Sequence, residues 1–160
     1  MGYSIATIDR GIVSWRFKPL ADPFPFVMIT SPADHRLIRN KRQAIGEEPC
    51  LIRAMTFGLD EVGSVGCQVD DGEWIPMQPD PDGRTWSVLA PIAGASPLTL
   101  TVRALTVHGR PGQHTITPGI RPLKPPPRSR GGSDAASIGA WPENGILGTQ
   151  LGPNRHGRKW

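Results

Sequence analysis

The sequence contains few of the residues from which metal centres and redox sites are built. Its 160 residues include only two cysteines, Cys50 and Cys67. They have no CxxC spacing and no histidine cluster nearby, so neither a zinc site nor a dithiol redox centre is indicated. We expect two reduced thiols in an apolar environment, with a Cys50–Cys67 disulfide as the less favoured alternative.

Established catalytic motifs are missing as well. The sequence has no phosphate-binding Walker loop and no glycine fingerprint for a dinucleotide. Asp70, Asp71 and Glu73 are explained better by a hairpin turn than by a cation site. The four histidines are isolated and expected to be solvated: His35, His108, His114 and His156. The sequence therefore assigns no catalytic, cofactor-binding or metal-binding residue to this chain.

Long hydrophobic runs are also lacking. Apolar stretches such as Phe26–Ile29 fall far short of the roughly 18 residues that cross a bilayer. The N-terminus has no secretory signal, and Ala6 stands where an acylation motif needs Ser or Thr. We expect no membrane partner and, by default, a cytoplasmic location.

Positive charge is scarce in most of the chain. Residues 1–117 hold 11 basic and 12 acidic side chains, whereas residues 118–160 hold 7 and 2. The net charge of +4 therefore belongs to the tail. A near-neutral body predicts no nucleic-acid partner for the folded part, although the basic, proline-rich tail leaves an adaptor or nucleic-acid arm as a third interpretation.

Glycine and proline are abundant, at 19 and 18 residues, which favours short strands joined by turns. Between residues 23 and 117, seven strand-like segments recur at a spacing of about ten residues. This pattern predicts an all-β protein, an immunoglobulin-like β-sandwich. The residues expected to face its core are Ile52, Ala54, Val65, Cys67, Val69, Trp74, Trp86, Leu98, Leu100 and Val102.

The first 22 residues predict a β-hairpin followed by a linker. Strands at 3–8 and 12–17 flank a turn at 9–11, and three prolines stiffen residues 18–25. An isolated hairpin is marginal in water, so this one needs another surface. Trp15 and Phe17 are therefore candidate docking residues.

A second hairpin is indicated at Asp71-Gly72, which is typical of a tight turn. Trp74 begins its return strand. We favour a core position for Trp74 and Trp86. The alternative, in which either of them or Trp141 is exposed, predicts a stacking platform for a sugar or a peptide.

From residue 118 onward the strand pattern ends. Pro122–Pro127 favours an extended linker, and residues 128–137 are rich in Gly, Ser and charge. We therefore expect a largely irregular, Pro/Gly-rich tail at 118–160. Its apolar residues Trp141, Leu151 and Trp160 are too few for a core and are candidate docking residues.

Particular strings of the sequence resemble a known family. The opening "GYSIATIDRGIVSWRFKPL" with "PFVMITSPADHRLI", and the closing "GSDAASIGAWPENGILGTQLGPNRHGRKW", resemble bacterial calcineurin-like metallophosphoesterases. The opening strings look like the junction at which the catalytic sandwich of those proteins ends and their C-terminal immunoglobulin-like domain begins. The closing string looks like their tail. The strings "VGCQVDDGEW" and "LTLTVRAL" are also similar to the accessory sandwich of molybdenum oxidases of the sulfite oxidase type.

The resemblance implies a parent hydrolase that binds two divalent metal ions through DxH, GD, GNH and GHxH motifs. None of these motifs occurs here, so they are expected upstream of Met1. The chain is then an accessory, docking C-terminal part without activity of its own, and its partner is the upstream catalytic domain. The alternative is a stand-alone β-sandwich that binds a carbohydrate or a protein.

Overall fold

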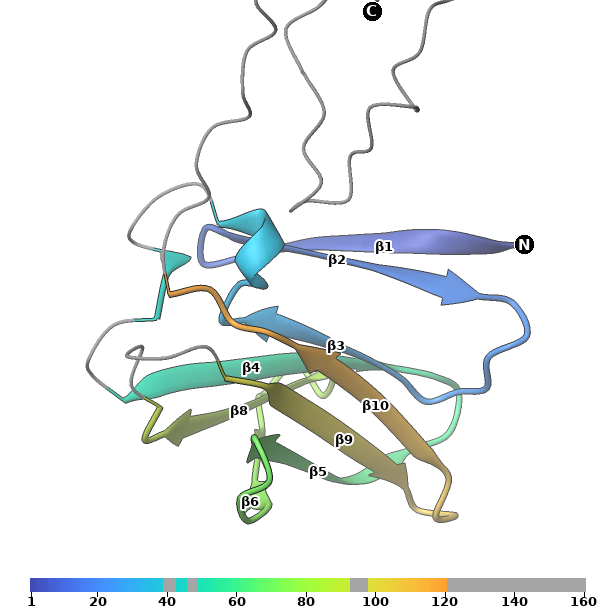
Figure 1. The fold of residues 1–160 in the computed structure, drawn as a ribbon. Coiled ribbons are helices and arrows are strands. Elements are labelled where there is room, and N and C mark those ends of the chain that lie inside the picture. The colour runs from blue at the N-terminus through green and yellow to red at the C-terminus, as the bar shows by residue number, and fades with distance from the viewer. Residues whose placement is uncertain (39–42, 46–48, 93–97, 121–160) are drawn as a thin grey trace, which may run out of the picture. The chain divides into compact units, whose positions relative to one another are not determined.

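The computed structural model of the protein describes residues 1–38, 43–45, 49–92 and 98–120 (Figure 1). They belong to one unit, Met1–Leu123; the other unit, Lys124–Trp160, lies outside the described residues. The basic residues Arg39, Lys41 and Arg42, for which the sequence favours a solvated loop, and most of the expected tail lie outside the described residues too.

Two antiparallel four-stranded sheets form a sandwich (Figure 1). One sheet has the order β3-β4-β8-β7, with strands Phe26–Ser31, Cys50–Phe57, Thr85–Ala90 and Gln78–Pro79. The other has the order β10-β9-β5-β6, with strands Pro111–Ile116, Leu100–Thr106, Val62–Val69 and Ile75–Pro76. This is the strand order of immunoglobulin-like sandwiches. The all-β sandwich predicted from strand spacing is confirmed.

The core lies between the two sheets and follows the alternation of their strands. Ile52 and Ala54 of β4 meet Cys67 of β5 and Leu100 and Val102 of β9, and all five are completely buried. Val69, Trp86 and Leu98 pack against this cluster while partly buried. Of the expected core residues, these and Val65 are placed correctly.

Trp74 does not lie in the core, so that prediction is wrong. The turn after β5 is longer than Asp71-Gly72 alone, since β5 ends at Val69 and β6 begins at Ile75. Asp70, rather than Gly72, has the positive φ, 49°. This five-residue loop leaves Trp74 outside the sandwich, with 37% of its surface exposed.

The return strand passes from one sheet to the other. Residues 75–76 pair with β5 as β6, and residues 78–79 pair with β8 as β7. Met77 lies at the crossing and is buried, and its N–H donates to the carbonyl of Val65 at 2.9 Å. A single short segment therefore joins both layers.

The N-terminal hairpin consists of β1, Gly2–Asp9, and β2, Ile12–Pro19, paired in register from Gly2 with Pro19 to Asp9 with Ile12. Its two-residue turn has positive φ at both positions, 50° at Arg10 and 80° at Gly11. Two such residues give the turn a twist that suits a tight hairpin. The predicted hairpin is confirmed.

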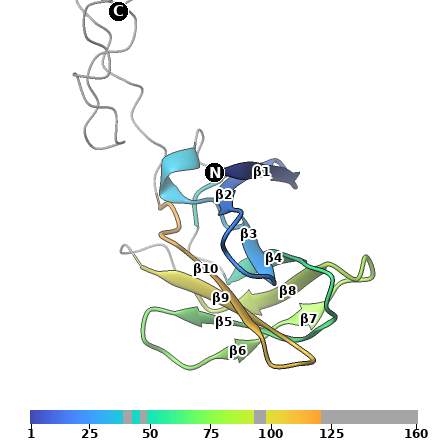
Figure 2. The ribbon, with the colours of Figure 1, turned by 90° about the vertical axis from the view of Figure 1, so that its right-hand side faces the viewer.

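The hairpin lies against β3, beside the sandwich (Figures 1 and 2). Val27 and Ile29 of β3 face the core, while Met28 and Thr30 alternate with them, and all four are at most 1% exposed. A strand buried on both faces requires cover outside the sandwich. The hairpin supplies part of that cover.

The segment expected to be a linker, residues 18–25, is exposed at 20–24 but buried at both ends. Lys18 still belongs to β2 and is buried, and Pro25 is buried against β10. A Cβ added to Gly112 of β10 would lie 2.0 Å from the carbonyl oxygen of Pro25. Only glycine permits this approach of the two backbones.

The segment after β3 also contributes buried side chains. A short 3-10 helix, His35–Leu37, is followed by Ile38 at 0% exposure, and Ile45 is buried as well. Asp34 forms an isolated bridge with Pro118, which ties this segment to the end of the sandwich.

Candidate docking surface

The two faces of the hairpin differ in chemistry, and the polar one faces the protein. Ser14 and Lys18 are 5% and 1% exposed, and Arg16 lies between them on the same face. The side chains that alternate with them along β2 are Val13, Trp15 and Phe17. From Val13 to Lys18, β2 therefore buries polar residues and presents apolar ones, the reverse of an ordinary half-buried strand, while β1 adds the partly buried Ile5 opposite Arg16.

The buried face is held by hydrogen bonds to the backbone of β3 and to the end of β2 and the residues that follow it. Ser14 Oγ donates to the carbonyl of Thr30 at 3.3 Å, and an Arg16 Nη donates to the carbonyl of Val27. Lys18 Nζ donates to the carbonyls of Pro19 and Asp22. Aromatic rings complete the cover, with Arg16 over Phe26 at 4.4 Å and Lys18 over Phe24 at 4.7 Å from the ring centroids.

An ionic contact anchors the turn end of the hairpin. One carboxylate oxygen of Asp9 accepts from Thr30 Oγ1 and from Arg53 Nε, each at 2.8 Å. Arg53 also pairs with Asp80 at 3.0 Å, and Asp80 accepts from Ser87 Oγ at 2.7 Å. Asp9, Arg53 and Asp80 are each about four-fifths buried, so solvent screens these contacts only partly.

His114 of β10 holds the edge of β3. Its Nδ1 accepts from the N–H of Ile29 at 3.0 Å, which requires a neutral ring with its hydrogen on Nε2. Burial lowers the pKa of His114 to about 4, and nearby Arg16 contributes to the same shift. The prediction that His114 is simply solvated is wrong, because its ring accepts a backbone hydrogen bond at the edge of β3.

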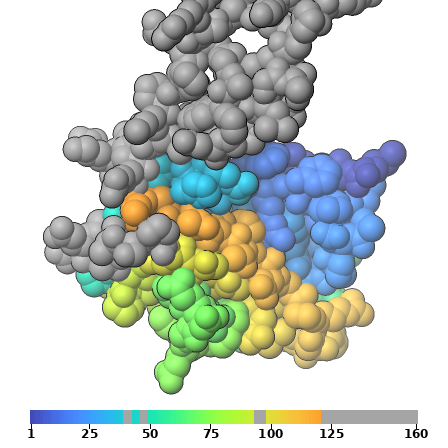
Figure 3. All heavy atoms as spheres, viewed as in Figure 1, coloured from blue at the N-terminus to red at the C-terminus, as the bar shows by residue number. Residues whose placement is uncertain are grey.

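The apolar face of the hairpin is open. Ile8, Val13, Trp15 and Phe17 are exposed by 80, 41, 52 and 47%. Cross-strand pairs of Ile8 with Val13 and of Ala6 with Trp15 place them on one face, the apolar hairpin face. The hairpin (blue) is part of the surface in Figure 3. Such a patch of neighbouring apolar side chains is typical of an interaction site.

Two of the five predicted docking residues, Trp15 and Phe17, lie together on this face. Trp141, Leu151 and Trp160 lie outside the described residues. Ile8 and Val13 contribute apolar surface to the predicted hairpin but were not among the predicted docking residues. Alternation along both hairpin strands would have placed them beside Trp15.

Titratable side chains elsewhere in the described segments do not form a reactive centre. No three His, Cys, Asp or Glu side chains in those segments lie close enough together to hold a metal ion. His35 lies 3.3 Å from Asp34, and His108 is exposed in a turn. Both cysteines are free, and burial raises the pKa of Cys67 to about 11. Such a thiol is protonated at neutral pH and a poor nucleophile.

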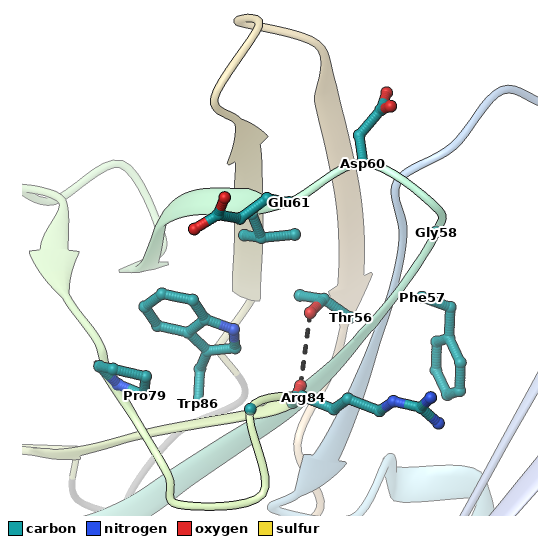
Figure 4. Close-up of a pocket in the computed structure, with 10 residues that line it drawn as sticks. Thr56, Phe57, Gly58, Asp60, Glu61, Pro79, Arg84 and Trp86 are labelled. Carbon is teal, nitrogen blue, oxygen red and sulfur yellow. Dashed lines mark hydrogen bonds between the residues drawn. The ribbon is translucent and has the colours of Figure 1, made fainter.

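A hollow of about 580 Å³ opens at one end of the sandwich (Figure 4). Trp86 forms a wall, and Thr56 Oγ1 donates to the carbonyl of Arg84 at 3.3 Å. The indole N–H of Trp86 has no hydrogen-bond partner among the described residues, yet it is also shielded from the solvent. A ligand in the hollow therefore cannot accept its hydrogen, so we do not assign a binding role to this hollow.

Comparison with known proteins gives no family. No protein family model and no curated protein match the chain. The chain is similar to the crystal structure of an engineered protein, with 24% sequence identity and a TM-score of 0.45 over 59% of this chain. The match spans 19% of that protein's length. Within residues 1–38, 43–45, 49–92 and 98–120, no helix has the length and apolar character needed to span a bilayer.

Proposed function

We propose that this chain is the accessory, docking C-terminal part of a metal-dependent phosphoester hydrolase of the calcineurin-like class. Its apolar hairpin face binds the catalytic domain, which supplies the two metal ions and the chemistry. The sandwich holds the hairpin in place and takes no part in hydrolysis. The sequence strings that resemble the junction and tail of those hydrolases support the family.

The inverted hairpin is the observation that carries the docking role. A hairpin that packed only on its own domain would turn Trp15 and Phe17 inward and leave Arg16 and Lys18 in water. Here the cations are satisfied by carbonyls and rings, and the aromatic side chains are left in solvent. This arrangement keeps an apolar surface rigid and accessible, as a permanent interface requires.

A binding experiment tests the proposal. The polypeptide encoded in frame upstream of Met1 is produced separately, checked for GNH and GHxH motifs, and titrated with this chain in a calorimeter. We expect binding that Trp15→Asp with Phe17→Asp weakens at least a hundredfold, since a buried charge is costly. Trp74→Ala, on another surface, is the matched control and leaves the affinity unchanged.

Activity distinguishes the two parts of the proposal. The upstream polypeptide is expected to hydrolyse nitrophenyl phosphate esters with manganese, and this chain alone is not. Turnover that follows this chain through purification overturns the accessory role. An upstream segment without the metal motifs overturns the family, and equal binding by the Asp variant overturns the docking face.

A further inference from the structure

Trp74 and Arg103 form a pair on the outer face of the sheet β10-β9-β5-β6, away from the apolar hairpin face. The Arg103 guanidinium carbon lies 4.2 Å from the centroid of the Trp74 ring. Beside the pair is a hollow of about 200 Å³, walled by Pro76, Leu105 and Ser64. Both members of the pair line it.

Gly66 makes this arrangement possible. It is paired directly with Arg103 across β5 and β9, and a Cβ at Gly66 would lie 3.4 Å from Cε3 of Trp74. The indole therefore rests against bare backbone next to the arginine. Packing against the sheet fixes the ring and, through stacking, the guanidinium.

Arg103 has no hydrogen bond or ion pair from its guanidinium to any described residue, and its side chain is exposed. By contrast, Arg36, Arg53 and Arg110 each pair with a carboxylate. Stacking leaves the N–H groups of a guanidinium free at its edges, where they match the two oxygens of a carboxylate. The cation is held in place without being neutralised.

The surroundings favour a sugar. Trp74, Pro76 and Leu105 offer apolar contacts for the C–H groups of a ring, and Ser64 offers a hydroxyl. One common way to bind a peptide is to add it as a strand to a free sheet edge. Here β9 lies between β10 and β5, and β5 is paired with β9 and, at Gly66 and Cys67, also with β6. Recognition therefore falls to side chains rather than to backbone groups.

We propose that the hollow beside Trp74 and Arg103 binds a uronate residue of an acidic polysaccharide. The Arg103 guanidinium binds the carboxylate, Trp74 contacts the sugar ring, and Ser64 binds a hydroxyl. The site is independent of docking at the hairpin, so either proposal stands if the other fails.

The test is affinity electrophoresis of the full chain in gels that contain polygalacturonate, alginate or hyaluronan, at 150 mM salt. The basic tail attracts any polyanion, so the informative quantity is the difference between the wild type and variants with the same tail. We expect Trp74→Ala to lower the affinity for at least one of these polymers tenfold or more. Leu89→Ala, at an exposed position of β8 in the other sheet, is the control and changes nothing.

A second variant tests the role of the charge. The basic tail gives both proteins some preference for a polymer over its methyl ester. Arg103→Gln is expected to reduce the wild type's preference for the free acid at least tenfold. Equal retardation of the wild type and Trp74→Ala in all three polymers overturns the site. Loss of binding in Trp74→Ala with no effect of Arg103→Gln overturns carboxylate recognition, and an equally Trp74-dependent affinity for poly-glutamate overturns the choice of a sugar.

Discussion

Side chains alternate between two faces both in the hairpin and in the sandwich. In the sandwich the inward face is apolar, whereas in β2 of the hairpin it is polar. In the sandwich, Ile52 and Leu100 turn inward and Arg103 turns outward. In the hairpin, Arg16 and Lys18 turn toward the protein and Trp15 turns outward. The sandwich is thus stabilised by apolar burial, whereas the hairpin is attached by hydrogen bonds and ion pairs. Hydrophobic residues on a strand therefore do not by themselves identify the core.

The largest expected effect comes from truncating one aliphatic side chain in the sandwich. Leu100→Ala should lower the free energy of unfolding by about 2 to 5 kcal/mol, because Leu100 is completely buried and a cavity remains. Trp15→Ala removes a larger side chain but should change it by less than about 0.5 kcal/mol, since Trp15 is on the open face. Urea unfolding followed by circular dichroism measures both, and a similar loss in the two variants would contradict the comparison.

A smaller effect is expected from acidification, through His114 at the junction of the two regions. The folded protein keeps the ring neutral down to a pKa of about 4, while the unfolded chain takes up the proton near 6.5. Stability is therefore complete above about pH 6.5 and falls as the pH decreases toward 4, by roughly 3 kcal/mol at most.

His114→Asn offers an amide oxygen to the N–H of Ile29 and does not titrate. The variant is expected to lack this part of the pH dependence, as measured by the urea midpoint at pH 7 and at pH 4.5. An identical loss of stability in both proteins on acidification would show that His114 does not sense pH.

The smallest effect is expected where the hairpin turn is anchored. Asp9→Ala removes the contacts to Thr30 and Arg53 and should cost about 1 kcal/mol, mostly in attachment of the hairpin. Amide hydrogen exchange should accelerate in residues 2–19 and stay unchanged in β9. Asp60→Ala, which breaks an exposed pair with Arg110, is the control. Uniform acceleration across both regions would mean that the hairpin and the sandwich open together.

Local patterns in the sequence predicted most of the strands, because each depends on alternation and turn residues nearby. The hairpin turn at Arg10 and Gly11 and the core positions of Leu100 and Val102 are examples. Contacts between distant segments were not predictable in this way. Ser14 meets Thr30 and His114 meets Ile29, and neither pair leaves a periodic signal.

Trp74 shows why the candidate sites were only partly predictable. The rule that a sandwich tryptophan is buried placed it in the core, but the loop before it is long enough to keep it outside. Gly66, which lies beside Trp74 in space, was the sign that a side chain packs closely against the backbone of β5 at this surface. Trp15 was predicted as a docking residue and lies exposed, yet the polar attachment behind it depends on backbone carbonyls of β3, which no sequence pattern reveals.

The crossing of the chain at Met77 has a mechanical consequence for the sandwich. β6 pairs with one sheet and β7 with the other, and only Met77 separates them in the chain. This covalent connection transmits force from one layer to the other. Sliding the layers past each other requires pulling Met77 out of its buried position and breaking its bond to Val65. A load carried through the sandwich is therefore shared by both layers, and they resist shear as one body.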